Sequence, residues 1–207
     1  YGITFNIGDR KANPKIAIID IVNKARENGY KGPLIMRFPH LIQKQLDKLF
    51  DSFHSSIKQY KYKGKFRAVF PLKVNQFPNF ILPLMEASKN KDYGLEAGSK
   101  AELIIAMAYT NLQSPITVNG FKDKEMIHLG FIASNMGHNI TLTIEGLNEL
   151  ETIIEVAKDM EPPYPKIGLR IRLHSMGSGI WAKSGGINSK FGLTSNELLE
   201  AINLLKN

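Results

Sequence analysis

The segment FRAVFPLKVNQ, Phe66–Gln76, decides how the rest of the chain is interpreted. Its first half is an apolar run typical of a buried strand. The run ends on Lys73, whose charged head group is costly to bury. The turn that follows, KVNQFPNF, contains no glycine. A nucleotide-binding doubly wound sheet usually has a glycine-rich turn after its first strand, so this turn favours the other α/β architecture, a (β/α)8 barrel.

From residue 33 onward, short apolar stretches alternate with stretches in which apolar residues recur at helical spacing. The pattern predicts strands at 33–38, 65–72, 93–98, 114–120, 138–144 and 165–173, and helices at 39–60, 79–90, 99–110, 122–136, 146–160 and 195–207. Pro39 suits a first helical turn, and Pro83 is expected to interrupt its helix. Ser99 with Glu102, and Thr194 with Glu197, predict capping boxes.

Counted from Phe66, the pattern gives five strand–helix units. A barrel needs eight strands, and five would leave an exposed edge. We therefore expect the chain to be the first part of a longer polypeptide.

The composition narrows the class of protein. The 207 residues carry a formal net charge of +8 and include no cysteine, which excludes disulfides, thiolate metal sites and a thiol nucleophile in this segment. No apolar run is long enough to cross a bilayer, and no secretion signal is visible, so a cytoplasmic location is expected. The densest basic cluster, KQYKYKGKFR at 58–67, is predicted to be a solvated helix end and turn.

Polar side chains follow the predicted strands at the ends where barrel enzymes carry their chemistry. They are Lys73, Glu96, Asn119, Glu145, and Arg172 with His174. Lys73 is either a lysine that forms a Schiff base with an aldehyde or a strand-end lysine that reaches solvent. Glu96 either orients or deprotonates that lysine, or holds a protonated cofactor nitrogen, or is an exposed loop carboxylate.

Other motifs are less informative. The loop GSGIWAKSGG, residues 177–186, lacks the spacing of a phosphate-binding P-loop, and we predict a lid or interface loop anchored by Trp181. The five histidines show no H-E-x-x-H spacing, so no metal site is visible.

Four segments together resemble one family: FPLKVNQ, GLEAGSKAEL, VNGFKDKEMI and RLHSMGSGIWAKSGGINSKFGL. They resemble the N-terminal half of the biosynthetic arginine decarboxylases, which belong to the alanine-racemase-like (fold-type III) pyridoxal-phosphate enzymes. The resemblance runs from Tyr1 to Asn207, essentially the whole chain. By this resemblance, Lys73 forms the internal aldimine with pyridoxal 5′-phosphate, and Glu96 lies near the cofactor. The stretch SKFGL, residues 189–193, also matches the family.

The resemblance further implies decarboxylation of L-arginine to agmatine for polyamine biosynthesis, with magnesium also required, by a cytoplasmic homo-oligomer (dimer or tetramer). Residues 1–207 would form an N-terminal segment and the first part of a pyridoxal-phosphate-binding TIM barrel, truncated before closure. The rest of the barrel, a C-terminal β domain and the remaining cofactor contacts would lie beyond Asn207. We therefore expect this stretch alone to be inactive.

Three other interpretations stay open. Another fold-type III enzyme, either a racemase or a decarboxylase for ornithine, lysine or diaminopimelate, would carry the same barrel lysine. A basic nucleic-acid-binding module would bind with strong salt dependence, although the chain shows no recognition motif. A non-catalytic scaffold would bind no cofactor.

Overall fold

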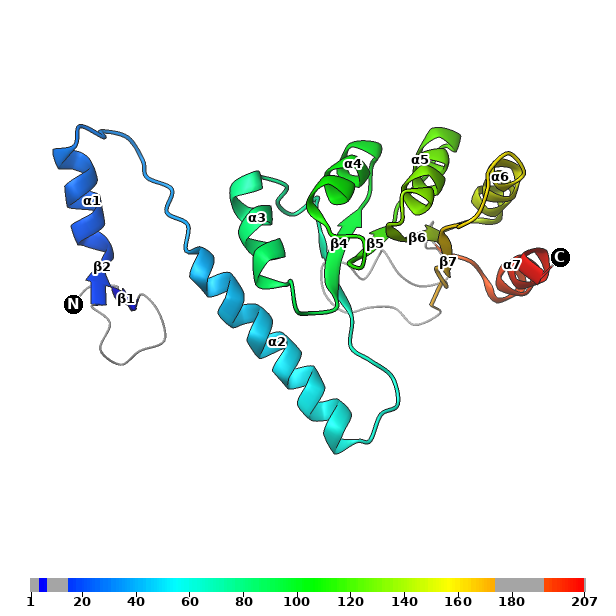
Figure 1. The fold of residues 1–207 in the computed structure, drawn as a ribbon, viewed down its shortest axis with the longest axis horizontal. Coiled ribbons are helices and arrows are strands. Elements are labelled where there is room, and N and C mark those ends of the chain that lie inside the picture. Colours follow the sequence, from blue (N-terminus) through cyan, green and yellow to red (C-terminus); the bar gives the residue numbers. More distant parts are fainter. Residues whose placement is uncertain (1–3, 7–14, 174–191, 207) are drawn as a thin grey trace. The chain divides into compact units, whose positions relative to one another are not determined.

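The computed structural model describes residues 4–6, 15–173 and 192–206. The chain divides into two compact units, Tyr1–Lys63 and Gly64–Asn207. Figure 1 follows the elements from one end of the chain to the other. Among the described residues, none of the helices combines the length and the apolar character needed to cross a membrane.

The first unit begins with elements that the sequence pattern does not predict. Strands β1 (Thr4–Asn6) and β2 (Lys15–Ala17) form a short antiparallel hairpin, and α1 (Ile18–Glu27) follows β2 directly. The strands have three residues each, which is too short for an alternating pattern to be recognised.

The predicted strand at 33–38 is wrong. This segment has no regular secondary structure and pairs with no strand in the described part of the chain. Ile35 is 79% exposed, so the apolar run does not mark a buried element. A strand needs a hydrogen-bonded partner, and local sequence alone does not supply one.

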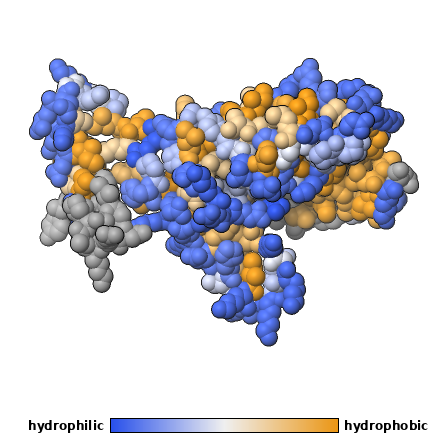
Figure 2. Space-filling view, in the orientation of Figure 1, coloured by the Kyte–Doolittle hydropathy of each residue, from blue (hydrophilic) through white to orange (hydrophobic). Residues whose placement is uncertain are grey.

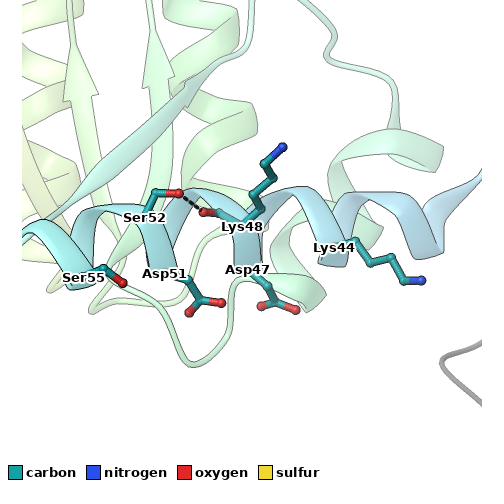
Figure 3. A pocket seen from close by; sticks show the side chains of 6 residues that line it. All are labelled: Lys44, Asp47, Lys48, Asp51, Ser52 and Ser55. Carbon is teal, nitrogen blue, oxygen red and sulfur yellow. Dashed lines mark hydrogen bonds between the residues drawn. The ribbon is translucent and has the colours of Figure 1, made fainter.

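Helix α2 (Pro39–Gln59) is confirmed, with Pro39 in its first turn. Leu46 and Phe50 are its buried residues. Figure 3 shows a polar face of the same helix, on which the Ser52 hydroxyl donates to the Lys48 carbonyl at 2.7 Å. This face is lined by Lys44, Asp47, Lys48, Asp51, Ser52 and Ser55. Charges of both signs alternate along one helix, which is typical of a solvated surface.

The second unit is a five-stranded sheet whose strands are all parallel and each followed by a helix. The strands are β3 (Ala68–Pro71), β4 (Tyr93–Ala97), β5 (Pro115–Val118), β6 (Asn139–Ile144) and β7 (Lys166–Leu169). The helices are α3 (Pro78–Ala87), α4 (Lys100–Tyr109), α5 (Lys124–Asn135), α6 (Leu147–Ala157) and α7 (Ser195–Lys206). The five predicted units are therefore confirmed.

The strand order decides between the two predicted architectures. The strands pair in the order β3-β4-β5-β6-β7, which is their order in the sequence. A doubly wound sheet reverses its strand order at a switch point, whereas a (β/α)8 barrel does not. Figure 1 shows the helices arranged along one side of this sheet. The second unit is therefore the partial barrel that the sequence predicts, with its sheet not closed in the described residues.

Side chains along the strands alternate between a face covered by helices and the opposite face, here called the inner face. Leu95, Ile116 and Ile140 occupy one row on the covered face and are at most 1% exposed. The next row, on the inner face, places Glu96 beside Thr117, which neighbours a further threonine on β6. The covered face thus holds the core, and the inner face is partly polar.

The predicted interruption of a helix at Pro83 does not occur. Helix α3 runs from Pro78 to Ala87 with Pro83 inside it, so the predicted interruption is wrong. The buried side chains of Ile81 and Leu84 flank this proline, and their packing offsets the one lost backbone hydrogen bond.

Both helix starts predicted from capping boxes are confirmed. The Thr194 hydroxyl accepts from the Glu197 amide at 3.4 Å, and the Glu197 carboxylate accepts from the Thr194 amide at 2.7 Å. Ser99 likewise accepts from the Glu102 amide at 3.2 Å, but the Glu102 carboxylate accepts from the Gly98 amide at 2.7 Å. In the Ser99 box, the glutamate therefore binds the amide of Gly98, the residue before the N-cap, rather than that of the N-cap itself.

Gly94 permits the close spacing of β4 and β5, which yields a test of the sheet. A Cβ added at Gly94 would lie 1.8 Å from the Pro115 carbonyl oxygen, which is backbone and cannot move aside cheaply. We expect Gly94→Ala to destabilise the protein by about 3 kcal/mol or more in denaturant unfolding. Gly32→Ala is the matched control, because a Cβ there has nothing within 4 Å. Equal stability of the two variants would contradict this account of the strand spacing.

Candidate functional site

The parallel order of the strands brings the predicted site residues to one edge of the sheet. Lys73 is exposed in the turn after β3. Glu96 lies inside β4, one residue before its end, and is half-buried. Asn119 and Glu145 directly follow β5 and β6. The structure therefore assembles these four residues at the carboxyl ends of neighbouring strands.

Lys73 and Glu96 interact electrostatically. Pro71 pairs with Glu96 in the sheet, and the Leu72 amide donates to the Glu96 carbonyl at 3.0 Å. Burial raises the pKa of the Glu96 carboxyl above its ordinary value, while the positive charge of Lys73 lowers it and the negative charge of Glu102 raises it further. Glu96 is thus a carboxylate that retains its proton more readily than an exposed glutamate.

The row beyond Glu96 on the inner face includes Asn119. The pairs Ala97 with Val118 and Val118 with Leu142 extend by one residue to align Gly98, Asn119 and Thr143. The Asn119 amide donates to the Ala97 carbonyl at 2.9 Å, so the ladder continues past the end of β5. Gly98 has no side chain, which leaves a gap in this row between the strand ends that carry Lys73 and Asn119.

A second arginine, Arg170, lies at this edge in addition to the predicted Arg172. Arg170 contacts Glu145 through Nη1 and Oε1 at 2.8 Å, and the same carboxylate accepts from the Gly120 amide at 3.0 Å. Arg172, the predicted residue, donates its backbone amide to the Leu193 carbonyl at 2.8 Å. Period-two alternation along the last strand places Arg170 and Arg172 on the same face, so the sequence offered no means to choose between them.

A buried ion pair supports this edge, and sequence reasoning missed it. Lys122 Nζ lies 3.2 Å from Glu149 Oε2, and their side chains are 0% and 4% exposed. Glu149 also accepts from the backbone amides of Lys122 at 3.0 Å and Glu145 at 2.9 Å. The pair therefore joins the loop after β5 to the loop after β6. The two residues are 27 positions apart and follow no motif, so no sequence signal identified them.

Several predicted features fall outside the described residues. These are His174, the loop 177–186 with Trp181, and residues 189–191 of the SKFGL stretch. Among the residues that are described, no three histidine or acidic side chains are grouped so as to hold a metal ion.

Comparison with known proteins identifies the family. Residues 44–207 match the family described as "Pyridoxal-dependent decarboxylase, pyridoxal binding domain". The chain belongs to this family. The matched residues include all five strand–helix units of this pyridoxal-binding domain and the strand-end residues Lys73, Glu96, Asn119 and Glu145.

Individual relatives of this pyridoxal-binding domain carry more specific names. A protein of Tolumonas auensis named biosynthetic arginine decarboxylase is 40% identical over 93% of this chain. One of Rhodopirellula baltica with the same name is 38% identical over 95% of the chain. The chain spans only about 30% of the length of these two relatives.

Solved structures agree with the family and the fold. The biosynthetic arginine decarboxylase of Campylobacter jejuni is 57% identical, with a TM-score of 0.86 over the whole of this chain and 32% of that one. A diaminopimelate decarboxylase of M. jannaschii has a TM-score of 0.70 over 99% of this chain and 44% of that one. Its identity is 20%, so this second likeness shows the fold alone.

The strand-end residues of the domain fit pyridoxal phosphate. Lys73 presents an exposed amine beside the half-buried Glu96. A Cβ at Gly98 would make ordinary contacts with Glu102 Oε2 at 3.5 Å and with the Asn119 carbonyl oxygen at 3.8 Å. Asn119 Oδ1 is buried and has no hydrogen-bond partner in the described parts of the chain. An amine and an unpaired acceptor at the same edge of the sheet are together consistent with a site for a polar cofactor.

The buried pair gives a stability prediction. Lys122→Met leaves the Glu149 carboxylate buried without its cation, and we expect a loss of about 3–5 kcal/mol in the free energy of unfolding. The double variant Lys122→Met/Glu149→Leu should recover much of that loss, because no lone charge remains buried. Lys124→Met, which breaks an exposed pair with Glu155, is the control and should change little. Denaturant titration that found no difference between Lys122→Met and Lys124→Met would show that the buried pair is not supporting the edge.

The raised pKa of Glu96 gives a prediction about pH. The folded protein binds more protons than the unfolded chain between the ordinary value of 4.5 and the raised pKa, so wild-type stability falls as pH rises through that window. Glu96→Gln has no charge to bury. Without added cofactor, we therefore expect it to match the wild type at low pH and to be more stable near neutral pH. Thermal unfolding at several pH values checks this, and a stability difference that did not change with pH would contradict it.

Proposed function

We propose that the protein to which this chain belongs is a pyridoxal-phosphate-dependent decarboxylase that converts L-arginine to agmatine. The observation that carries the proposal is the electrostatic interaction of Lys73 with Glu96 at the strand ends of a pyridoxal-binding domain. The choice of arginine is supported by the names of the relatives at 38–40% identity and of the structure at 57% identity.

Lys73 is the proposed attachment point of the cofactor. Its side chain is exposed at the sheet edge, so its amine is accessible to an aldehyde. When bound, pyridoxal phosphate acts as an electron sink for the pair of electrons left by the departing carboxylate. In this proposal Glu96, whose pKa is raised, holds a proton near the lysine nitrogen and keeps that nitrogen oriented.

Residues further along the edge support this pair. Glu145 fixes the Gly120 amide and the Arg170 guanidinium, and the buried Lys122–Glu149 pair holds the loops that carry them. These contacts keep the strand ends in place around the proposed site. Precise placement of this kind limits the motion of reacting groups.

We also propose that the remaining parts of the enzyme lie in the rest of a longer polypeptide. The relatives are about three times as long as the chain, which supports this. Figure 2 shows apolar surface gathered beside β7 and α7. Ile171 and Leu173, which follow β7, and Leu199, in α7, are each more than half exposed. Further barrel strands and helices would cover such a surface. A cytoplasmic location and a homo-oligomeric state, expected from the sequence, belong to the same proposal.

A requirement for magnesium is proposed from the family resemblance alone. The described residues offer no group of ligands for it, so no step of the proposed reaction is assigned to it.

Other members of the same structural class are the second candidate. The diaminopimelate decarboxylase structures share 18–20% identity with the chain, which supports their fold but not their substrate. Nucleic-acid binding has less support, because several lysines of the chain are neutralised in ion pairs. Examples are Lys89 with Glu86, Lys100 with Asp123, and Lys124 with Glu155.

The first test is the absorbance of the full-length protein with pyridoxal phosphate. In the wild type we expect a near-violet absorbance band and a cofactor–protein adduct that borohydride traps. In Lys73→Ala we expect neither. Lys100→Ala is the control, since Lys100 starts the helix after β4 and is paired with Asp123 and Glu125. A band that survived in Lys73→Ala but not in the control would move the attachment point away from Lys73.

The second test compares substrates. We expect the full-length protein to release carbon dioxide from L-arginine at least about tenfold faster, by kcat/KM, than from ornithine, lysine or diaminopimelate. A difference of this size requires about 1.4 kcal/mol of selective transition-state binding. A preference for one of the other amino acids would transfer the proposal to the second candidate.

A further inference from the structure

Asn119 carries a buried oxygen that the fold leaves unused. Its Oδ1 is shielded from solvent and accepts no hydrogen bond from any residue in the described ranges. Burying an amide oxygen without a partner is unfavourable, and buried polar atoms are nearly always paired in folded proteins. Such an atom calls for a donor that is not part of the described chain.

The surrounding backbone keeps Asn119 in place. Its own amide is bonded to the Ala97 carbonyl at 2.9 Å. The next residue, Gly120, has a positive φ of +80° and donates its amide to Glu145 at 3.0 Å. Because the residue is tied on both sides, the side chain is held at the end of β5 rather than released to find a partner elsewhere.

The position of Asn119 indicates where the donor comes from. Lys73 lies in the turn after β3, Asn119 directly follows β5, and Gly98 follows β4 between them. Space for a Cβ exists at Gly98, so the glycine is not required by the packing of the described chain. A protonated polar atom of a bound molecule is the chemical complement of an amide oxygen.

We propose that Asn119 is a further residue of the cofactor site, and that its Oδ1 accepts a hydrogen bond from a protonated polar atom of pyridoxal phosphate when the cofactor is bound at Lys73. The inference rests on the proposed function, because it requires the cofactor to be attached at Lys73. It assigns to Asn119 a role in binding and orientation. It also explains why an unpaired oxygen is kept in the apo fold: the oxygen gains its partner only on cofactor binding.

The proposal predicts opposite effects on stability and on binding. Removal of an unpaired buried oxygen relieves a cost, so Asn119→Leu, measured in the full-length protein without cofactor, should unfold at the same temperature as wild type or higher. The same variant should weaken the binding of pyridoxal phosphate about tenfold or more, measured as a dissociation constant by absorbance titration. Asn119→Asp keeps an acceptor oxygen and should bind within about threefold of wild type.

Asn139 provides the matched control. It is also an asparagine on the inner face, but it lies at the opposite edge of the sheet, and its Oδ1 already accepts from Lys166 Nζ at 2.8 Å. Asn139→Leu should therefore lower apo stability and leave the dissociation constant of pyridoxal phosphate unchanged.

Two results would overturn the inference. An Asn119→Leu variant that binds pyridoxal phosphate like the wild type removes the proposed contact. A variant that is destabilised without cofactor, as Asn139→Leu should be, shows that the oxygen has a structural partner in the protein. Failure of the proposed function looks different: the wild type itself would then bind no cofactor, and the inference would fall with it.

Discussion

The order in which the strands pair is the constraint on which the rest of the structure depends. Five parallel strands, each hydrogen-bonded to the next in the sequence, bring all their carboxyl ends to one edge. Pro71 pairs with Glu96, and this register is what puts Lys73 within electrostatic reach of that carboxylate. A slip of one residue would turn every side chain of a strand to the other face and would bury the charges under the helices. The chemistry of the edge is therefore a property of the sheet.

A buried ion pair also supports the edge of the sheet at which the strands end. Glu149 accepts two backbone amides from two different loops and lies 3.2 Å from the ammonium of Lys122. One of those two amides belongs to Glu145. The carboxylate of Glu145 in turn accepts from the Gly120 amide and forms an ion pair with Arg170. A chain of contacts thus runs from a fully buried pair to the exposed groups of the site. Contacts of this kind hold functional side chains more firmly than loops alone can.

The sequence predicted most of the second unit but, in the first unit, only the helix α2. Alternation of apolar strands and amphipathic helices is a local signal, and so are the caps at Ser99 and Thr194, which is why the five units and two helix starts are correct. The apolar run at 33–38 carries the same local signal without a partner strand, and it is not a strand. The local pattern of apolar residues indicates which side chains a segment could bury. Whether the segment pairs as a strand depends on residues that are distant in the sequence.

In the candidate site, too, some features could be predicted from the sequence and others could not. Strand ends can be read from the sequence, so Lys73, Glu96, Asn119 and Glu145 were predicted to lie together, and they do. The contact between Arg170 and Glu145 was not predicted, because it joins residues 25 positions apart through side-chain geometry. The unpaired state of Asn119 was equally invisible, since it depends on what the folded chain fails to place nearby.

The contrast between buried and exposed ion pairs has a consequence for behaviour in salt. The pairs that link neighbouring helices, such as Lys100 with Asp123 and Lys124 with Glu155, are well exposed. Mobile ions screen exposed charges effectively at physiological ionic strength and above, but they screen a buried pair such as Lys122 with Glu149 much less. Rising ionic strength should therefore loosen the helical layer first and leave the carboxyl edge of the sheet intact. The part of the molecule that holds the strand ends in register is the part least sensitive to the salt around it.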